Sequence, residues 1–254
     1  MYKDFVVYEQ ERYSYKEVWS RASAIGSYLV HDAKVRRGDR VAICMRNYPE
    51  WPIAFIAITA IGAVAVPMNS LWKSKELEYG LKDSGAKVVI CDEQRYGYMK
   101  RTIRDLGLVA VGVRTSVASR NFERIVIDYR NTRMPFSPDL RTDDVAAIFY
   151  TSGTTGFPKG VVQTHRGVCN QLATVLVVDN LRLFAGPSDV SKQQQPCMIC
   201  PVPLFHVTAS HHIFLSSAAR GAKLVLMYKW YVVFSLLLRP IHPLHSPTGM
   251  QGWH

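Results

Sequence analysis

Cysteine is scarce in this sequence, and no hydrophobic run is long enough to cross a lipid bilayer. Five cysteines among 254 residues do not provide a disulfide framework, which favours a reducing compartment. The longest apolar stretches, including residues 230–238, fall well short of the roughly 20 residues that a membrane-spanning helix needs. The first residues, Met-Tyr-Lys-Asp, are polar and do not resemble a secretory signal peptide. We expect an intracellular protein, cytoplasmic by default, with no membrane span.

Negative charge is also in short supply. Twenty Asp and Glu residues against 31 Lys and Arg residues give a formal charge of +11, and a basic chain favours anionic partners. The basic residues are scattered, with pairs such as Arg36-Arg37 but no long run, and no nucleic-acid-binding module is recognisable. We therefore expect anionic small molecules as partners, and no nucleic acid.

One stretch, residues 151–160, concentrates small polar residues around a single positive charge and reads TSGTTGFPKG. Converging backbone N–H groups and hydroxyls bind phosphate, and glycines let the backbone approach the anion. Pro158 restricts the backbone before Lys159, and Lys159 supplies a compact cation. The flanking sequence predicts a buried strand over residues 145–150 and a helix from His165 to about Val178, with Thr164 as its N-cap. Strand, glycine-rich loop and helix commonly hold a nucleotide phosphate.

This loop lacks the motifs of the commonest nucleotide-binding and hydrolytic enzymes. It does not have the glycine, four residues and Gly-Lys-Ser/Thr of a Walker A loop. Gly153, Gly156 and Gly160 lack the Gly-x-Gly start of the dinucleotide fingerprint. Ser152 is not in the Gly-x-Ser-x-Gly turn of the α/β-hydrolases. Ordinary NTPases, dehydrogenases and serine hydrolases are therefore poor fits.

Apolar strands alternate with helical patterns along the chain. Such alternation predicts an α/β fold whose parallel sheet has helices on both faces. Residues 131–144 are polar and contain proline, which indicates a linker, and a second α/β unit begins at Val145. The expected strands are 41–45, 63–67, 87–91, 109–113, 125–127, 198–202 and 223–227, and the expected helices are 15–30, 49–61 and 75–82.

A group of cysteines and histidines near residue 200 allows two interpretations. Cys197, Cys200, His206 and His211 supply the side chains of a structural zinc site. Only six positions separate Cys200 from His206, which is too short for the usual zinc finger. Both cysteines also lie in a strand pattern, where cysteine behaves as a small apolar residue. We expect no metal site, and from the residues alone His206 is a histidine at a strand end.

The phosphate-loop stretch closely resembles the signature loop of the adenylate-forming enzymes, which include acyl-CoA synthetases, 4-coumarate-CoA ligases and luciferases. The family pattern Tyr-Thr-Ser-Gly-Thr-Thr-Gly-x-Pro-Lys-Gly-Val matches residues 150–161 without a mismatch. Further segments, such as RRGDRVAICMRNYPEW and PVPLFHVTA, carry the resemblance to about Trp230. It implies stacked flavodoxin-like subdomains with parallel sheets flanked by helices, as an incomplete N-terminal domain. We place a first subdomain at 1–140, a partial second at 141–230 and an aberrant tail without fixed structure at 231–254.

The resemblance also implies roles for individual residues. In the family this loop embraces the β- and γ-phosphates of ATP, and the Pro-Leu-Phe-His motif, here residues 203–206, places His206 beside the acyl pocket and the coenzyme A route. The family reaction uses ATP, Mg²⁺ and coenzyme A to convert a carboxylic acid to an acyl-adenylate and then to a thioester. The expected ATP-phosphate-binding residues here are Thr151, Ser152, Gly153, Thr154, Thr155, Gly156 and Lys159.

Later family motifs for adenine, ribose, magnesium and the C-terminal lysine are not found in this sequence. We therefore expect the N-terminal part of an AMP-forming synthetase for a fatty or aryl acid, inactive as this chain and without a complete catalytic set. The alternative is a non-catalytic nucleotide-binding or interaction fragment. Residues after Trp230 resemble a translated intron or frameshift, or else a lineage-specific tail. An incomplete domain is expected to expose apolar surface and to self-associate through it.

Overall fold

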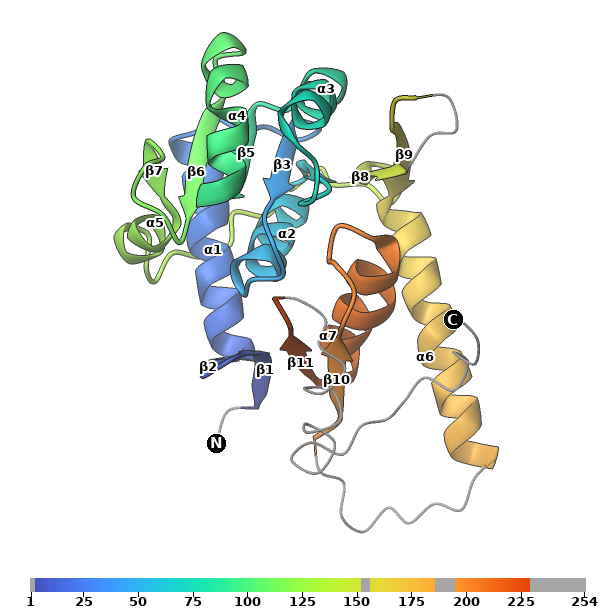
Figure 1. The fold of residues 1–254 in the computed structure, drawn as a ribbon. Helices are drawn as coiled ribbons and strands as arrows, with labels where there is room; N and C mark the ends of the chain where they lie inside the picture. Colours follow the sequence, from blue (N-terminus) through green and yellow to red (C-terminus); the bar gives the residue numbers. More distant parts are fainter. Residues whose placement is uncertain (1–2, 152–155, 186–194, 229–254) are drawn as a thin grey trace.

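The computed structural model describes residues 3–151, 156–185 and 195–228, and these residues form two sheets with helices packed around them (Figure 1). The larger sheet has seven strands in the order β7-β6-β5-β3-β4-β8-β9. Its strands are β3 (Arg40–Cys44), β4 (Val64–Pro67), β5 (Val88–Asp92), β6 (Val109–Val113), β7 (Arg120–Asn121), β8 (Val145–Thr151) and β9 (Lys159–Thr164). All neighbouring pairs are parallel except β8 and β9.

The first five strands of this sheet have the flavodoxin-like arrangement. In chain order β3 to β7 are strands one to five, and across the sheet they stand in the order two, one, three, four, five, which is the doubly wound topology of flavodoxin. The predicted α/β fold with a parallel sheet is therefore confirmed. The helices around the two sheets are α1 (Tyr15–His31), α2 (Glu50–Ala60), α3 (Ser74–Ser84), α4 (Glu93–Asp105), α5 (Phe122–Asp128), α6 (His165–Ala185), the π-helix η2 (Thr208–Leu215) and α7 (Ser216–Arg220).

A second sheet of four strands joins the two ends of the described chain. Its order is β10-β11-β1-β2, with β1 (Asp4–Tyr8), β2 (Glu11–Ser14), β10 (Cys197–Cys200) and β11 (Lys223–Leu226). Strand β1 lies parallel to β11, with Val6 paired to Leu224, and β8 joins the larger sheet through the pairing of Ala147 with Ala65. Each of the two sheets therefore contains strands from before residue 140 and strands from after it. The subdomain boundary stays a prediction, and the proposed tail at 231–254 lies outside the described residues.

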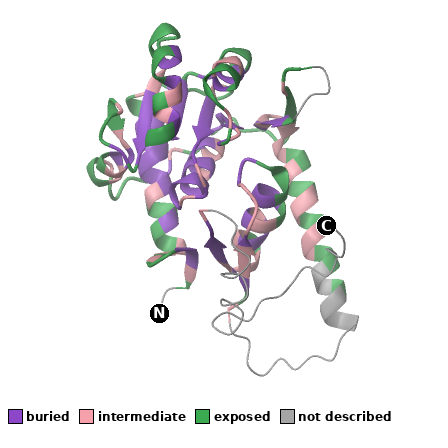
Figure 2. Ribbon diagram, in the orientation of Figure 1, coloured by how far each residue is buried: buried purple, intermediate pink, exposed green. Residues whose placement is uncertain are grey.

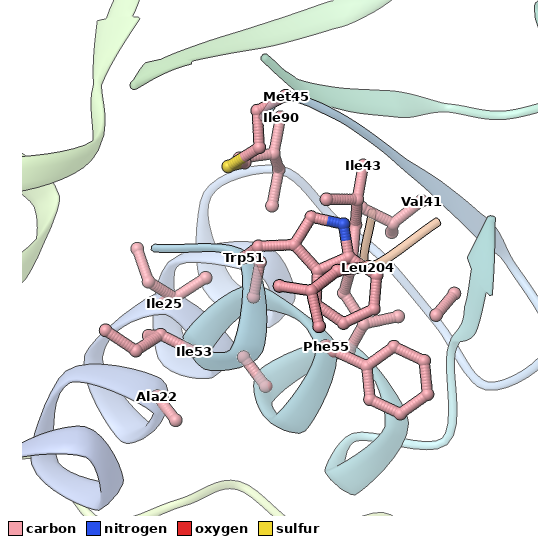
Figure 3. Close-up of a cluster of buried hydrophobic side chains, with 14 of the residues drawn as sticks. Ala22, Ile25, Val41, Ile43, Met45, Trp51, Ile53, Phe55, Ile90 and Leu204 are labelled. Carbon is pink, nitrogen blue, oxygen red and sulfur yellow. The ribbon is translucent and has the colours of Figure 1, made fainter. Parts of the chain in front are cut away.

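Strands β3, β4, β5 and β6 of the larger sheet are buried along nearly their whole length, which is why they are apolar at nearly every position. Ile43 and Ile90 belong to the cluster that packs under α1 and α2, while Ala42 and Val89 belong to the cluster under α3 and α4. Figure 2 shows these strands buried while much of α6 is partly or fully exposed. Figure 3 shows Trp51 of α2 in the same cluster as Ile43 and Ile90, where its ring stacks on that of Phe55 with centroids 5.4 Å apart.

Local sequence signals fix several helix ends. Ser14 caps α1, because its hydroxyl accepts a hydrogen bond from the Glu17 amide and the Glu17 carboxylate accepts one from the Ser14 amide, which is a capping box. Helix α3 ends at Gly85, whose φ of 59° is left-handed and favours glycine. Both helices lie where the sequence predicts them.

One predicted strand is wrong. Residues 125–127 lie in helix α5, where the Asn121 side chain accepts a hydrogen bond from the Arg124 amide at 3.0 Å and caps the helix. Phe122 and Ile125 are buried while Ile127 is 54% exposed. Burial at a spacing of three residues is the periodicity of a helix face, and three apolar letters are too few to reveal it.

Candidate functional site

The predicted phosphate loop lies at the carboxyl end of β8. Strand β9 returns antiparallel to β8 and pairs Thr151 with Lys159 and Tyr150 with Gly160. The parallel strands β3, β4 and β8 all end at this edge of the sheet, and the carboxyl edge is where open α/β sheets bind their ligands. Four of the predicted phosphate-binding residues, Ser152, Gly153, Thr154 and Thr155, lie outside the described residues.

The loop does not lead directly into a helix, so the predicted strand-loop-helix order is wrong at this point. The six residues of β9 come between the loop and α6 and separate them by about 20 Å of extended chain. Helix α6 does begin at His165 as predicted, and the Thr164 hydroxyl accepts a hydrogen bond from the Gly167 amide at 3.2 Å. A phosphate on the loop is therefore too far from this helix terminus to gain from its dipole, which acts within the first turn.

Both arms of the loop are attached to α3. On the first arm, the Tyr150 hydroxyl donates a hydrogen bond to the Asp83 carboxylate at 2.6 Å. Burial, together with that carboxylate, raises the pKa of Tyr150, so the phenol keeps its proton and remains a donor. On the second arm, the Phe157 ring stacks on the Tyr79 ring with centroids 4.7 Å apart. The two attachments hold the ends of the loop beside α3.

The described part of the loop offers room and positive charge. Gly156 has a φ of 102°, and a Cβ atom at this position would meet nothing within 4 Å, so the backbone is open to a ligand and its conformation favours glycine. Lys159 is exposed. No carboxylate in the parts of the chain that the structure describes forms an ion pair with it. Its ammonium group is available to an anion, and this charge and space fit a polyphosphate.

His206 lies in the segment between β10 and η2, and Asn47 holds that segment in place. The Asn47 amide nitrogen donates a hydrogen bond to the Val202 carbonyl at 3.0 Å, and its carbonyl oxygen accepts one from the Leu204 amide at 2.9 Å. His206 itself is exposed, with its ring 4.4 Å from that of Phe205, and partial desolvation lowers its pKa. Sequence reasoning missed Asn47, although a polar residue just past the end of strand 41–45 is a recognisable signal.

A second histidine connects this segment to the phosphate loop. His211 of η2 is buried, and its ring meets the Phe149 ring of β8 edge-on at 5.3 Å. Its Nδ1 atom lies 2.9 Å from the Ser210 hydroxyl, and burial lowers its pKa to about 4, so it is neutral at pH 7. Strand β8 ends in the loop and η2 follows His206. The contact between His211 and Phe149 therefore joins β8, which leads into the phosphate loop, to η2, which follows the His206 segment.

The alternative zinc site gains no support. Cys197 and Cys200 lie in β10 and are buried, and burial raises the pKa of the Cys200 thiol to about 12. Within residues 3–151, 156–185 and 195–228, no group of three His, Cys, Asp or Glu side chains could hold a metal ion. Both thiols are buried in the protein interior, where the Cys200 thiol donates a hydrogen bond to the Val202 carbonyl at 3.3 Å.

A surface cavity of about 440 Å³ lies at the other end of the larger sheet. It is lined by the first residues of three parallel strands, Arg40, Val64 and Val145. The Arg37 guanidinium on its rim is already paired with the Asp144 carboxylate at 2.6 Å. The cavity is thus at the amino edge of the sheet, away from the loop, and we do not assign it to the same site.

The family membership rests on a match along nearly the whole chain. The sequence model of the AMP-binding enzyme family, described as "AMP-binding enzyme", matches residues 2–244. The chain belongs to this family. The expected resemblance to adenylate-forming enzymes is confirmed, but the expectation that it ends near Trp230 is wrong, because the match continues to residue 244.

Plant ligases are among the similar curated proteins. 4-Coumarate-CoA ligase 3 of Arabidopsis thaliana is 31% identical over 220 residues, which are 87% of this chain and 38% of that protein. 4-Coumarate-CoA ligase 2 of Solanum tuberosum is 31% identical over 236 residues, covering 91% of this chain and 41% of that protein. The chain therefore spans about two fifths of the length of these relatives.

Solved structures share the fold. MatB from Rhodopseudomonas palustris with bound ATP superposes with a TM-score of 0.79 at 23% identity, over 94% of this chain and 45% of that one. The o-succinylbenzoate CoA synthetase of Bacillus subtilis, in complex with its acyl-adenylate intermediate, superposes with a TM-score of 0.75 at 23% identity, over 96% and 45% of the two chains. The fold is that of the N-terminal domain of adenylate-forming enzymes. No described helix is both long and apolar enough to span a membrane.

Proposed function

We propose that this AMP-binding protein supplies the ATP-phosphate-binding part of an acid-CoA ligase. The observation that carries the proposal is the β8–β9 hairpin, which places Thr151 opposite Lys159 and carries Gly156 in the loop between them. The reaction we propose for the whole enzyme has two steps. A fatty or aryl carboxylate attacks the α-phosphorus of ATP, which releases pyrophosphate and forms an acyl-adenylate. The coenzyme A thiolate then attacks the acyl carbon, which releases AMP and forms the thioester. The names of the plant relatives favour an aryl acid.

The loop residues would bind and orient the triphosphate. Lys159 would neutralise phosphate charge, Thr151 would donate from its hydroxyl, and Gly156 would let the backbone amides approach the oxygens. We assign Ser152, Gly153, Thr154 and Thr155 to the same role from their sequence. The described residues offer no carboxylate cluster for Mg²⁺, so we derive no step through that ion. We place His206 on the acyl and coenzyme A side from the Pro-Leu-Phe-His motif of residues 203–206, a segment that Asn47 holds through two hydrogen bonds.

Replacing Lys159 by alanine is expected to weaken the binding of ATP and of pyrophosphate about 10- to 100-fold, because one charge-assisted hydrogen bond contributes roughly 1.5–3 kcal/mol. Isothermal titration calorimetry of the intact chain and the variant measures the change. Two controls accompany it. Lys100→Ala removes the same charge from the exposed surface of α4, and His206→Ala alters the acyl side; both are expected to leave phosphate binding almost unchanged. Equal losses in all three variants would place the phosphate site elsewhere.

We also propose that this chain binds phosphate without completing the ligation. In the assay, the chain is incubated with ATP, Mg²⁺, coenzyme A and one of three acids: 4-coumarate, o-succinylbenzoate or a long-chain fatty acid. Mass spectrometry then detects any thioester that forms. No thioester, together with measurable binding of pyrophosphate, is the expected result. Thioester formation would contradict the expected inactivity and leave the binding proposal intact.

A further inference from the structure

Helix α3 presents one face to both arms of the phosphate loop. Tyr79 and Asp83 are four residues apart on this helix, so their side chains lie on the same face. The Tyr79 ring stacks on the Phe157 ring, which precedes β9. The Asp83 carboxylate accepts the hydrogen bond of the Tyr150 hydroxyl, which comes from β8. The two contacts therefore come from neighbouring turns of a single helix.

Helix α3 is fixed to the body of the sheet, whereas the end of the hairpin near Lys159 is exposed. Leu77 and Leu81 of α3 are buried in the same cluster as Ala42 and Val89 of the sheet. The first four residues of β9, in contrast, are exposed. The position of Lys159 therefore depends on the pairing of β9 with β8 and on the contacts to α3.

The Tyr150 side chain connects α3 to the backbone beside Lys159. Tyr150 pairs with Gly160 across the β8–β9 ladder. A Cβ atom at Gly160 would lie 3.6 Å from Cε1 and Cζ of the Tyr150 ring, so the ring packs on the Gly160 backbone. Its hydroxyl reaches the Asp83 carboxylate at 2.6 Å. Tyr150 therefore spans the distance from α3 to the residue that follows Lys159.

Phe157 restrains Lys159 from the other side. Only Pro158 separates the two residues, and the proline ring fixes the backbone φ between them. Phe157 is 64% exposed even in its stack with Tyr79, and such exposed side chains contribute little to the stability of a fold. The contact is therefore better explained by where it holds the chain than by the stability it supplies.

We propose that Tyr79 and Asp83 are positioning residues that hold the Lys159 ammonium group where it meets a polyphosphate. Tyr79 acts through Phe157, and Asp83 acts through Tyr150. This inference rests on the proposed phosphate-binding role of the loop. The apparent dissociation constant rises as the fraction of the protein in the binding-competent arrangement falls, so contacts that hold this arrangement increase the affinity for the anion.

The stack is tested by changing each of its rings. Tyr79→Leu and Phe157→Leu are each expected to weaken pyrophosphate binding about 3- to 10-fold, in proportion to the loss of the competent arrangement. Since both rings belong to one contact, the double variant should bind no more weakly than either single variant. Tyr79→Phe keeps the ring and should keep the affinity. The matched control is Phe136→Leu, because Phe136 is 60% exposed and packs on Trp19 of α1, and it should leave binding unchanged.

The hydrogen bond is tested by changing each of its partners. Tyr150→Phe removes the hydroxyl, keeps the ring on Gly160 and changes no charge, and we expect it to weaken pyrophosphate binding about 3- to 10-fold. Asp83→Ala separates positioning from electrostatics. Removing a negative charge beside the loop would by itself favour an anion, whereas the loss of positioning weakens its binding. Weaker binding by Asp83→Ala is the expected result, and tighter binding would contradict the proposal.

Combination with Lys159→Ala distinguishes this inference from the proposed function. Isothermal titration calorimetry with pyrophosphate measures each affinity, and circular dichroism confirms that each variant is folded. In the Lys159→Ala background, Tyr79→Leu and Tyr150→Phe should have no further effect, because they act through Lys159. If Lys159→Ala leaves binding unchanged, the proposed function is wrong and the inference fails with it. If Lys159→Ala weakens binding, but the other two changes have no effect or an equal effect in both backgrounds, only the positioning inference is wrong.

Discussion

Replacing Trp51 by alanine is expected to lower the free energy of unfolding by about 3–5 kcal/mol, because a large aromatic side chain leaves a cavity that the core fills only in part. Trp51 is 1% exposed. Its ring stacks on Phe55 at 5.4 Å and meets Phe214 of η2 edge-on at 6.2 Å. The side chain therefore joins α2 to η2, which lies far along the chain, and its loss weakens the packing between these two helices.

Urea unfolding followed by far-ultraviolet circular dichroism measures this change, since that signal comes mainly from the backbone and not from the tryptophan removed. The matched control is Trp19→Ala on α1, because Trp19 is 46% exposed and exposed positions change stability by about 0.5 kcal/mol or less. Trp51→Phe keeps most of the volume and should cost less than Trp51→Ala. Equal shifts for the Trp19 and Trp51 alanine variants would show that Trp51 is not part of a packed core.

Strands β3 to β6 of the larger sheet could be predicted from sequence, because a strand buried on both faces is apolar at nearly every position. Strands β3 to β6 were each expected within one residue of where they lie. Helix α4 was not predicted. Its buried residues, Arg95, Met99, Thr102 and Ile103, include a charged and a polar side chain. Arg95 is buried because its guanidinium pairs with the Asp92 carboxylate at 3.0 Å, and hydropathy does not reveal such a pairing.

The candidate site was predicted in its residues but not in its framework. The density of small donors around Lys159 is a local signal, and it identified the loop. Strand β9 was missed because the first four of its residues are exposed, so the strand has no buried face to produce alternation. The contacts that hold the site are far apart in sequence: Tyr150 bonds Asp83, and Asn47 bonds Leu204 across 157 positions. Neither pairing has a periodic signature.

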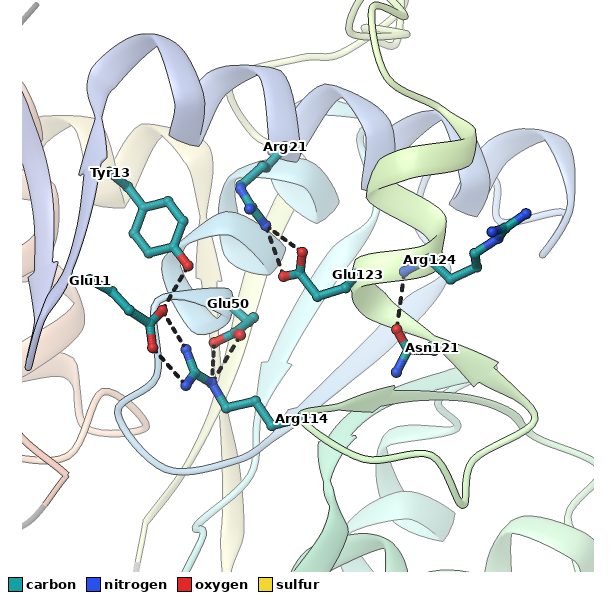
Figure 4. Close-up of polar contacts among 8 residues, drawn as sticks. All are labelled: Glu11, Tyr13, Arg21, Glu50, Arg114, Asn121, Glu123 and Arg124. Atoms are coloured by element: carbon teal, nitrogen blue, oxygen red, sulfur yellow. Dashed lines mark hydrogen bonds and ion pairs between the residues drawn. The ribbon is translucent and has the colours of Figure 1, made fainter.

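Replacing Arg114 by methionine is expected to lower the free energy of unfolding by about 3 kcal/mol at pH 7. This value is the lower end of the range for breaking a buried ion pair. We choose the lower end because the Arg114 side chain is about one-third exposed. Figure 4 shows its guanidinium between two carboxylates. Its Nη atoms donate to both Glu11 oxygens at 2.8 Å, and its Nε donates to Glu50 at 3.0 Å. Glu11 belongs to β2 of the four-stranded sheet, and Arg114 follows β6 of the seven-stranded sheet, so the variant removes an ion pair between the two sheets. It also leaves the buried carboxylate of Glu50 on α2 without its partner.

The loss of unfolding free energy caused by Arg114→Met should shrink as the pH falls, because protonation of Glu11 and protonation of Glu50 both reduce it. Hydrogen bonds from Arg114 lower the pKa of Glu11, so this carboxylate stabilises the fold above its unfolded pKa and loses that effect on acidification. Burial raises the pKa of Glu50 in spite of Arg114. The buried charge of Glu50 therefore lowers the stability of the fold above the unfolded pKa of 4.5. This loss of stability is larger when Arg114 is absent, and it disappears once Glu50 is protonated.

Urea titrations of both proteins from pH 7 to pH 4 test this account, with Arg101→Met as the control for an exposed arginine whose pairing with Asp105 should matter little. Adding Glu50→Gln to Arg114→Met removes the unpaired buried charge, so we expect it to recover part of the lost stability at pH 7 and to flatten the pH dependence. The guanidinium carbon of Arg114 also lies 5.3 Å from the ring centroid of Tyr8 and 4.9 Å from that of Tyr48. If Arg114→Met lowers stability equally at pH 4 and pH 7, and Glu50→Gln restores none of it, then Arg114 stabilises the fold mainly through packing on these two rings.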